Sequence, residues 1–300
     1  MRTENRHLKA EHRVCPWGGM CPQSPVKSPS RSTIGKRKRL QVLMYHRVCP
    51  DSQAVTSRFV VSKDTFRKQM EFLALHGFCT PTISNILLGA TENCNAGKQP
   101  IIITFDDGYL DTYENAFPIL KEFGLSPIVF VIADFSRSVN SWDKDGALCN
   151  APLLRPYHIR IMSESGIQFG VHSLTHSSLP SLNDAELDQE LCLSRTALKG
   201  VIRQTFPILA YPYGDVNERV KNAGKRAGYR CAFSAHSGPL KYSSDLFEIR
   251  RIFMTNRTSR IYLMYKASGL DHVFRWGVWR LKRLFVSGSR IKTPNINQNR

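Results

Sequence analysis

The sequence predicts an α/β fold in which seven parallel strands alternate with helices and close into a barrel. Strand-like apolar runs alternate with helical patterns from Gln41 onward, and this alternation is typical of a parallel sheet joined by right-handed crossovers. The chain has 300 residues, of which 42% are hydrophobic, so it can bury the large core that a barrel requires. Seven such units favour a barrel over an open sheet.

Each predicted strand is a short apolar run bounded by polar or turn-forming residues. The clearest is the β-branched run Ile101-Ile102-Ile103-Thr104-Phe105, which is typical of a buried strand. In chain order, the seven candidate strands are 41–45, 101–105, 127–132, 167–171, 206–211, 229–233 and 249–254.

Helical patterns lie between these strands. The stretch 62–76 follows the N-cap candidate Ser62. The stretch 184–200 follows Asn183, with Glu186 three positions later in the manner of a capping box. The other two patterns are 109–123, which Pro118 interrupts, and 216–227, which ends at Gly228.

Basic residues are concentrated at the two ends of the chain. Residues 1–39 contain 10 Lys/Arg and 2 acidic residues, and residues 275–300 contain 7 Lys/Arg and no acidic residue. The stretch 40–274 contributes only +3 of the net charge of +18. We interpret 1–39 as a basic disordered extension, 40–268 as the folded domain, and 269–300 as a basic amphipathic helix and tail.

The basic ends do not by themselves predict a nucleic-acid-binding protein. The sequence contains no metal finger, RNP-type strand or helix-turn-helix pattern, so we expect no nucleic-acid partner. The N-terminal extension lacks the hydrophobic region of a conventional signal peptide. No run of about 18 apolar residues indicates a membrane span, and these features favour a cytoplasmic protein.

Cysteine usage points to the same compartment. The eight cysteines are scattered without a Cys-x-x-Cys pair, which suits reduced thiols better than a disulfide framework. They are Cys15, Cys21, Cys49, Cys79, Cys94, Cys149, Cys192 and Cys231.

Two adjacent carboxylates, Asp106 and Asp107, stand with Gly108 at the exit of the predicted strand 101–105. Neighbouring carboxylates repel each other unless a cation or a proton relieves them. Taken alone, an Asp-Asp-Gly sequence is more often simply a turn. Its position directly after a buried strand favours a cation site.

A histidine pair, His172 and His176, follows the predicted strand 167–171. Such a pair alone more often marks a helix face. One aspartate and two histidines, however, supply the three ligands of a catalytic zinc, which keeps a further position open for water. The second aspartate is then free to act as a base. The intervening Ser-Leu-Thr contains no Glu, so this is not the zincin protease pattern.

Further strand exits carry polar residues. His46 follows the predicted strand 41–45, and Tyr213 lies in the turn Tyr211-Pro212-Tyr213-Gly214 after the strand 206–211. Catalytic groups of barrel enzymes gather at the C-terminal ends of the strands. Four strands far apart in sequence are therefore expected to direct these groups toward one mouth.

Three of these motifs resemble, in order, the first three motifs of the polysaccharide deacetylases, the NodB-homology family of carbohydrate esterases. They are Thr104 to Tyr109, the His172/His176 pair, and Tyr211 to Gly214. The resemblance covers roughly residues 40–268. Trp142-Asp143 and Gly228-Tyr229 through Arg250-Arg251-Ile252 are similar to further landmarks of the family. The resemblance implies a distorted (β/α)7 barrel.

The resemblance also implies a role for each motif. It gives Asp107, His172 and His176 as ligands of a divalent metal, most simply zinc, and Asp106 as the general base. Tyr213 would offer its backbone N–H to the developing oxyanion. The expected substrate-binding residues are Pro212, Gly214, Trp142, Arg250 and Arg251.

The chain departs from the family pattern in two places. The family's third motif commonly has an Arg before Pro-Tyr-Gly that supports the base, and here either Arg250 or Arg251 could supply that charge. The family's acid motif, Leu-x-His, is matched in letters only by Leu270-Asp271-His272 in a helical, basic context. His46 is the better candidate for the general acid. Its position at the end of a strand before the Asp-Asp motif resembles a subgroup of the family in which the acid motif comes first.

Residues 269–286 carry an apolar stripe flanked by tryptophans and basic residues. This mixture is typical of an amphipathic helix on an anionic membrane surface, although the stripe could equally pack against the barrel. A peripheral membrane contact would suit a lipid-linked glycan substrate.

The combined prediction is a metal-dependent hydrolase that acts on a non-peptide C–N bond and removes N-acetyl groups from a polysaccharide or glycolipid. Two alternatives stay open at this point. One is the hydrolysis of a different non-peptide C–N bond or an O-acetyl ester on the same fold. The other is a non-catalytic sugar-binding barrel, which should have lost a ligand or the base, whereas this sequence retains all of them.

Overall fold

The structure is a computed structural model that describes residues 40–51, 57–88, 98–143, 146, 148–203, 206–236, 245–259 and 262–263. The predicted N-terminal extension lies outside the described residues. The same is true of the predicted amphipathic helix at 269–286 and of the Leu270–His272 motif. These predictions therefore stay untested.

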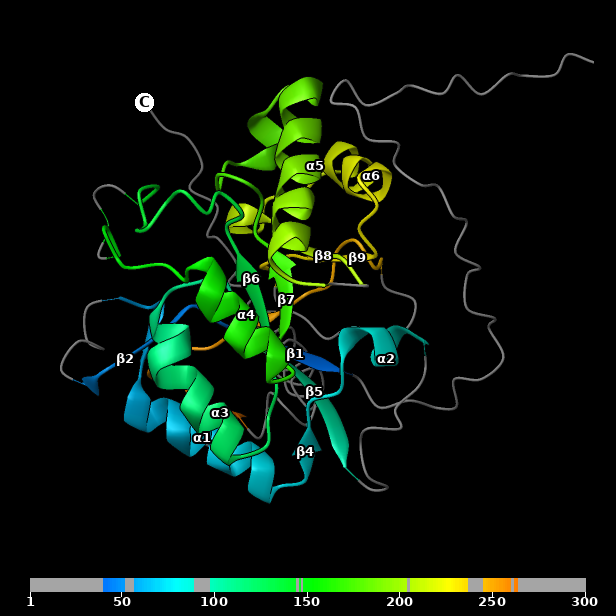
Figure 1. Cartoon of the computed structure of the whole chain (residues 1–300). Helices are drawn as coiled ribbons and strands as arrows, with labels where there is room; N and C mark the ends of the chain where they lie inside the picture. The colour runs from blue at the N-terminus through cyan, green and yellow to red at the C-terminus, as the bar shows by residue number, and fades with distance from the viewer. Residues whose placement is uncertain are drawn as a thin grey trace, which may run out of the picture.

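Parallel strands form a curled sheet at the centre of the molecule (Figure 1). Within the described residues the strand order is β10-β1-β5-β6-β7-β8-β9, and every neighbouring pair is parallel. The strands are β1 (Gln41–Tyr45), β5 (Gln99–Phe105), β6 (Ile128–Val131), β7 (Gln168–Val171), β8 (Ile208–Ala210), β9 (Cys231–Phe233) and β10 (Ile252–Phe253). All seven predicted strands are confirmed.

The two ends of this strand order meet through the segment before β10. Ile249 forms a parallel bridge with Phe233 of β9, and β10 pairs with β1 three residues later. The chain from 249 to 253 therefore connects β9 to β1 and completes a distorted barrel, which confirms the predicted fold class.

Three short strands were not predicted from the sequence. β2 (Arg47–Cys49) and β3 (Val60–Ser62) form a separate parallel pair, and β4 (Phe78–Cys79) pairs with the start of β5. Strands of two or three residues are too short to show a period of two.

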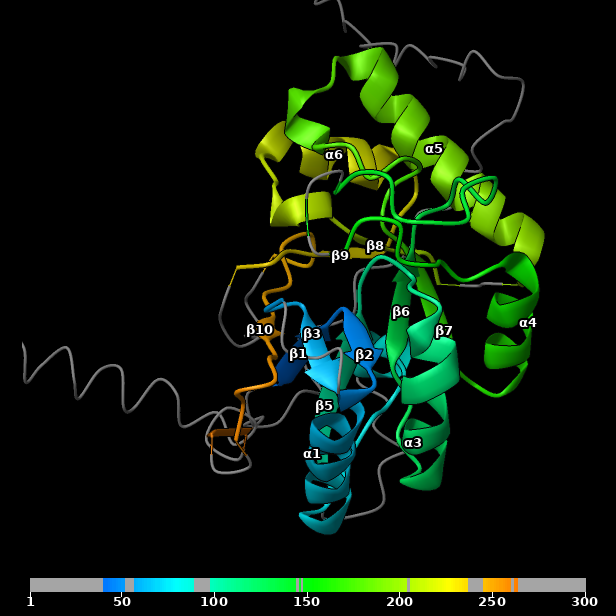
Figure 2. The ribbon, with the colours of Figure 1, turned by 90° about the vertical axis from the view of Figure 1, so that its left-hand side faces the viewer.

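The helices lie around the outside of the strands (Figure 2). Three predicted helices are confirmed: α1 (Lys63–Leu75), α5 (Asp184–Val201) and α6 (Glu218–Arg226). Ser62, Asn183 and Asn217 cap them, and Asn183 forms the predicted capping box with Glu186. The predicted interruption near Pro118 separates the π-helical turn η2 (Thr112–Ala116) from α3 (Phe117–Glu122). The remaining helices are α2 (Ile83–Leu88), α4 (Pro156–Glu164), η3 (Leu179–Ser181) and η4 (Pro212–Gly214).

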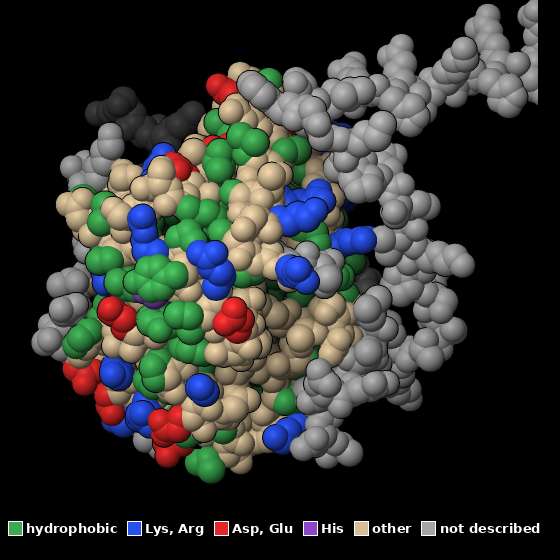
Figure 3. Space-filling model, viewed as in Figure 1, with side chains coloured by type: hydrophobic (Ala, Val, Ile, Leu, Met, Phe, Trp, Pro, Cys, Tyr) green, Lys and Arg blue, Asp and Glu red, His purple; other side chains and the backbone are tan. Residues whose placement is uncertain are grey.

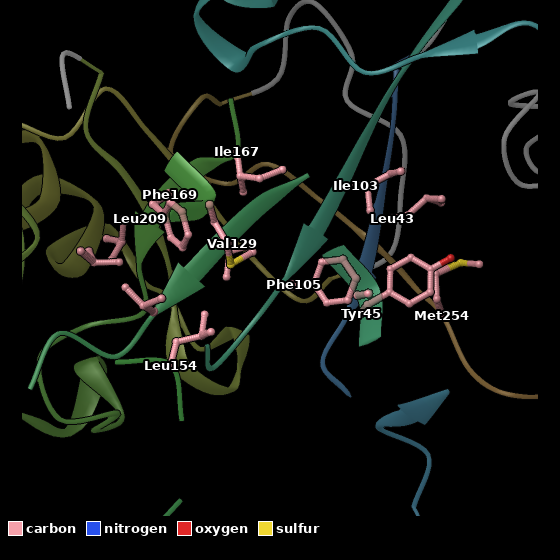
Figure 4. Packing of buried hydrophobic residues seen from close by; sticks show 14 of the residues in the cluster. Leu43, Tyr45, Ile103, Phe105, Val129, Leu154, Ile167, Phe169, Leu209 and Met254 are labelled. Carbon is pink, nitrogen blue, oxygen red and sulfur yellow. The ribbon is translucent and has the colours of Figure 1, made fainter. Parts of the chain in front are cut away.

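The two faces of the strands bury different hydrophobic clusters. The cluster toward the helices contains strand residues such as Leu43, Phe105 and Phe169 (Figure 4). It also contains helix residues such as Leu187. Strand residues of opposite parity, among them Val42, Ile102, Phe130 and Ile208, form the second cluster. Side chains alternate along a strand, so these two clusters cover the two faces of the strands. Since both faces are buried, an open polar site can lie only at the strand exits.

The visible face of the described part carries charges of both signs (Figure 3). Basic and acidic side chains are interspersed with hydrophobic ones on the face shown in Figure 3. No helix in this part of the chain combines the length and apolar character that a membrane crossing needs.

The prediction that the cysteines are reduced thiols holds only in part. Cys49, Cys149, Cys192 and Cys231 form no disulfide. Cys79 is disulfide-bonded, so the prediction of reduced thiols throughout is wrong at this position. Since disulfides persist mainly in oxidising compartments, cysteine usage no longer supports a cytoplasmic location.

Candidate active site

The residues singled out at the strand exits lie around one pocket at the C-terminal ends of the strands. The pocket has a volume of about 560 Å³, which is within the usual range for a small-ligand site. Its lining includes His46 after β1, Asp106 and Asp107 after β5, His172 after β7, and Tyr213 after β8. Residues from four strands therefore meet at one mouth, as the barrel fold predicts.

The turn after β5 separates the two adjacent carboxylates. Asp106 still follows the strand, because its N–H donates to the carbonyl of Tyr45 in β1 at 3.0 Å. Asp107 and Gly108 then adopt positive φ angles of 69° and 70°. A Cβ at Gly108 would lie 2.9 Å from Val131 Cγ1, so this turn requires glycine. The sharp turn lets the two carboxylates bind different partners.

Asp107 and the two histidines form a compact ligand cluster. One carboxylate oxygen, Asp107 Oδ1, lies 3.4 Å from His172 Nε2 and 3.3 Å from His176 Nε2. All three ligand atoms lie within 4.8 Å of one another, and all three residues are buried. Two ligands at about 2.1 Å from a tetrahedral zinc are about 3.4 Å apart. The observed spacing therefore fits a divalent metal between these side chains.

The ionisation of the cluster also suits a metal. Burial lowers the pKa of His172 to about 4, so the imidazole is neutral at pH 7. Burial alone would raise the pKa of Asp107, but the hydrogen bond and charge of His176 outweigh it and hold that pKa well below its usual range. A neutral imidazole, as at His172, and an ionised carboxylate, as at Asp107, are the forms of these groups that bind metals.

A backbone carbonyl orients the first histidine. His172 Nδ1 lies 2.9 Å from the carbonyl oxygen of Ala210 at the end of β8. This contact makes Nδ1 the protonated nitrogen and leaves Nε2 as an acceptor facing Asp107, which is the usual arrangement around a metal-binding histidine.

Asp106 is bound on both carboxylate oxygens by Arg251. The guanidinium donates from Nη1 to Oδ1 at 2.6 Å and from Nη2 to Oδ2 at 2.7 Å, and both side chains are buried. Burial alone would raise the pKa of Asp106, but the charge of Arg251 outweighs it and holds that pKa below its usual value. Asp106 is therefore ionised at neutral pH and can accept a proton.

Arg251 is itself fixed by the barrel. Its Nε donates to the carbonyl of Ser234 at 2.9 Å, and Nη1 lies 3.2 Å from Thr104 Oγ1. Its neighbour Arg250 has a side chain that is 54% exposed and lies 3.7 Å from Glu248. Arg250 does not line the pocket. Of the two candidates, Arg251 is the one that reaches the carboxylate pair.

His46 lines the pocket near the carboxylates. Its ring packs between Phe59, at a centroid distance of 4.8 Å, and Phe253, at 5.6 Å. Burial lowers the pKa of His46, although Asp107 and Asp106 act in the opposite direction. Its buried Nδ1 has no hydrogen-bond partner among the described residues. The imidazole is thus held by apolar contacts, with one ring nitrogen left unpaired.

The turn after β8 brings Tyr213 to the rim of the pocket. Tyr213 has a φ of 59°, is 58% exposed, and its ring lies 4.7 Å from that of His176. Gly214, at φ 75°, also lines the pocket, and a Cβ there would collide with Ala235. Pro212 is buried and is not part of the lining.

Aromatic side chains line the pocket beside the cluster. Trp142 packs against His176 at 4.8 Å. Phe59 and Phe253, which both pack against His46, contact each other at 5.5 Å, and the guanidinium of Arg58 lies over both rings. Only Trp142 was predicted from the sequence, because the other three follow no motif.

A buried tyrosine, Tyr109, lines the pocket and interacts with the Asp107 carboxylate. Asn140 Nδ2 donates to the hydroxyl oxygen of Tyr109 at 2.8 Å. Burial raises the pKa of Tyr109, and the charge and hydrogen bond of Asp107 act in the same direction. Tyr109 therefore stays protonated and can donate to Asp107. It directly follows Gly108, which is the one sequence signal that could have identified it.

Comparison with known proteins finds the same family that the sequence motifs resemble. Residues 93–232 match the model of the polysaccharide deacetylase family. The poly-beta-1,6-N-acetyl-D-glucosamine N-deacetylase of Staphylococcus epidermidis (strain ATCC 35984 / DSM 28319 / BCRC 17069 / CCUG 31568 / BM 3577 / RP62A) is 26% identical over 207 residues, covering 66% of this chain and 69% of that protein. The protein of the same name from Staphylococcus aureus (strain MRSA252) is 24% identical over 242 residues, covering 76% and 83%.

A solved structure shares the fold. The deacetylase PplD of Streptococcus pyogenes, solved in complex with acetate, aligns with a TM-score of 0.65 at 22% identity. The alignment covers 76% of this chain and 98% of that one. With the family model matching residues 93–232 and the three motifs grouped in one pocket, the chain is similar in sequence to the polysaccharide deacetylases and shares their fold.

Proposed function

We propose that this protein is a metal-dependent hydrolase that removes N-acetyl groups from a polysaccharide or glycolipid. The observation that carries the proposal is the placement of the Asp107–His172–His176 cluster beside the Arg251-bound carboxylate of Asp106 in one pocket. The two staphylococcal relatives are named for N-deacetylation of poly-β-1,6-N-acetyl-D-glucosamine. That polymer is the first substrate to test.

In this proposal Asp107, His172 and His176 hold the metal, and zinc fits the two imidazoles and one carboxylate best. A divalent ion bound there would polarise the acetyl carbonyl and lower the pKa of its water to about 7. Asp106 accepts the proton of the attacking water, since Arg251 keeps it ionised. The backbone N–H of Tyr213 donates to the oxyanion, and an aligned donor of this kind contributes roughly 3–4 kcal/mol.

His46 is proposed as the general acid that protonates the leaving amine. It lines the pocket together with both aspartates. Burial lowers its pKa, so the imidazole is mostly neutral at pH 7 and would take up a proton in the pocket before donating it to the amine. Trp142 and Gly214 are proposed to contact the sugar, because both line the pocket next to the ligand cluster. Pro212, Arg250 and Arg251 lie outside the lining, so any contribution from them would act through their neighbours, as Arg251 does through Asp106.

Acetate release from a panel of glycans tests the function. The panel contains β-1,6-linked and β-1,4-linked N-acetylglucosamine oligomers and an O-acetylated sugar, each incubated with chelated protein and again after zinc is returned. We expect zinc-dependent acetate release that is fastest on an N-acetylated oligomer. Faster release from the O-acetyl ester would favour the esterase alternative. Binding without any release would favour a non-catalytic barrel.

His46→Ala is expected to lower kcat by roughly 10²–10⁴-fold, because general acid catalysis typically contributes that much. Single-turnover kinetics measures the chemical step directly, and thermal unfolding checks that the barrel is intact. His76→Ala is the matched control, since His76 is exposed at the end of α1 and is not part of the pocket lining. Near wild-type activity of His46→Ala would exclude His46 as the acid and direct attention to His236 or His272.

Arg251→Met is expected to reduce the free energy of unfolding by about 3–5 kcal/mol, because it leaves a buried carboxylate without its partner. It should also raise the pKa of Asp106. Since the base works only when ionised, the acidic limb of the kcat/KM profile should then move to higher pH. Arg250→Met is the control, and its exposed position predicts a change within about 0.5 kcal/mol. Equal effects of the two variants would contradict the role of Arg251.

A peripheral contact of residues 269–286 with an anionic membrane remains a proposal, and it rests on their sequence pattern. Vesicle sedimentation of the full chain and of a chain without residues 269–300 tests it. Equal binding of both proteins to anionic vesicles would show that this segment is not the anchor.

A further inference from the structure

A buried carboxylate outside the pocket binds the segment that carries both histidines. Glu190 lies in the middle of α5 and is 8% exposed. Its Oε2 accepts hydrogen bonds from the backbone N–H groups of Leu174, at 2.8 Å, and Thr175, at 3.0 Å. Its Oε1 accepts one from the hydroxyl of Thr175. All three donors lie between His172 and His176 in the chain.

The backbone of this segment is strained and therefore needs support. Ser173 has a φ of 62° and His176 a φ of 67°. Non-glycine residues in this region cost roughly 1–3 kcal/mol each and persist only when their surroundings fix them. The hydroxyl of Ser173 accepts from the N–H of His176 at 3.0 Å, which closes the turn from within.

Two groups outside the segment 172–176 also bind its backbone. At the exit of β6, the N–H groups of Ala133 and Asp134 donate to the carbonyls of Ser173 and Leu174 at 3.1 and 3.0 Å. These bonds satisfy carbonyl groups only. Glu190 satisfies the amide groups of the same segment, because its Oε2 accepts from both N–H groups.

We propose that Glu190 is a positioning residue that holds residues 172–176 in the conformation in which both imidazoles face Asp107. This inference rests on the metal site proposed above. Glu190 touches neither imidazole in the contacts described, so it acts through the backbone of Leu174 and Thr175. Loss of its acceptor oxygens would let the strained turn relax and would separate the two Nε2 atoms before any metal arrives.

The test compares zinc affinity across three substitutions of Glu190. Glu190→Ala removes both acceptor oxygens, and Glu190→Asp keeps the charge but withdraws the carboxylate by one methylene. Glu190→Gln removes the charge but keeps a carbonyl oxygen that can accept from both N–H groups. Asp188→Asn on the same helix is the control, because Asp188 is 49% exposed. Zinc dissociation constants are measured by competition with a chromogenic chelator.

We expect Glu190→Ala and Glu190→Asp to raise the zinc dissociation constant by roughly 10–100-fold, which is the effect of removing other groups that orient metal ligands. Gln should stay within a few-fold of the wild type, and Asp188→Asn should be unchanged. The absorption spectrum of the Co²⁺-substituted protein should change in the Asp variant but not in the Gln variant. In the metal-free protein, the Leu174 and Thr175 amides should exchange hydrogen faster in the Asp variant.

Wild-type zinc affinity in both the Ala and Asp variants would overturn the inference while leaving the metal site intact. A Gln variant as weak as the Asp variant would also overturn it, because charge rather than the acceptor position would then be decisive. If Glu190→Ala does not fold, the Asp and Gln pair carries the comparison alone. Failure of the wild type to bind zinc would instead refute the metal site and, with it, this inference.

Discussion

Asp106→Asn is expected to reduce kcat by roughly 10³–10⁴-fold, near the upper end of the contribution of general base catalysis. The amide has nearly the same shape as the carboxylate but cannot accept the proton of the attacking water. Zinc binding should persist, because Asp106 is bound by Arg251 rather than by the imidazoles. Acetate release and zinc content, measured on the same preparation, check both parts of this prediction.

Asp107→Asn is the matched comparison for this experiment, since it makes the same chemical change one residue later. It should lose zinc, whereas Asp106→Asn should retain it. The opposite result, with zinc lost only from Asp106→Asn, would mean that the two aspartates have exchanged roles. Asp106→Asn also leaves the buried Arg251 guanidinium without its carboxylate, so the free energy of unfolding must be measured before a loss of rate is interpreted.

Removal of the metal is expected to abolish acetate release, and Asp107→Ala should have the same effect irreversibly. Chelated wild-type protein should recover its activity when zinc is returned, whereas Asp107→Ala should not. The loss of zinc affinity in the variant should exceed the roughly 10–100-fold effect of groups that only orient ligands. Acetate release and zinc content before and after metal return provide the measurement.

Thermal unfolding gives an independent check of the same site. Because zinc binds only the folded protein in this proposal, zinc at 1,000 times its dissociation constant should stabilise the wild type by about 4.1 kcal/mol. Asp107→Ala should show almost no such shift. An equal shift in both proteins would place the zinc outside the Asp107–His172–His176 cluster.

The sequence alone was sufficient for the seven strands of the barrel and for the motifs at their exits. The run 101–105 is apolar on both faces because β5 is buried on both faces, and such a run is visible without any knowledge of its partners. The caps of α1 and α5 depend on residues three positions apart, so they too are local. The exits of β5 and β7 were therefore placed correctly, and the barrel rule brought them together.

Sequence patterns did not identify the groups that support these motifs. Glu190 contacts a segment 15 and 16 residues away, and Phe59 and Phe253 meet beside His46 although they are far apart in the chain. None of them belongs to a motif, since any residue that the fold brings to the right place can perform such a task. The bonding state of Cys79 was likewise not evident from the spacing of the cysteines.

The choice between Arg250 and Arg251 shows most directly what the tertiary structure decides. The sequence identified both as candidates to support the base, and the two are adjacent and chemically identical. Successive side chains of an extended segment point to opposite sides. The bridge of Ile249 to β9 and the pairing of β10 with β1 fix which side faces inward. Arg251 consequently reaches Asp106, 145 residues earlier in the chain, while Arg250 lies at the surface.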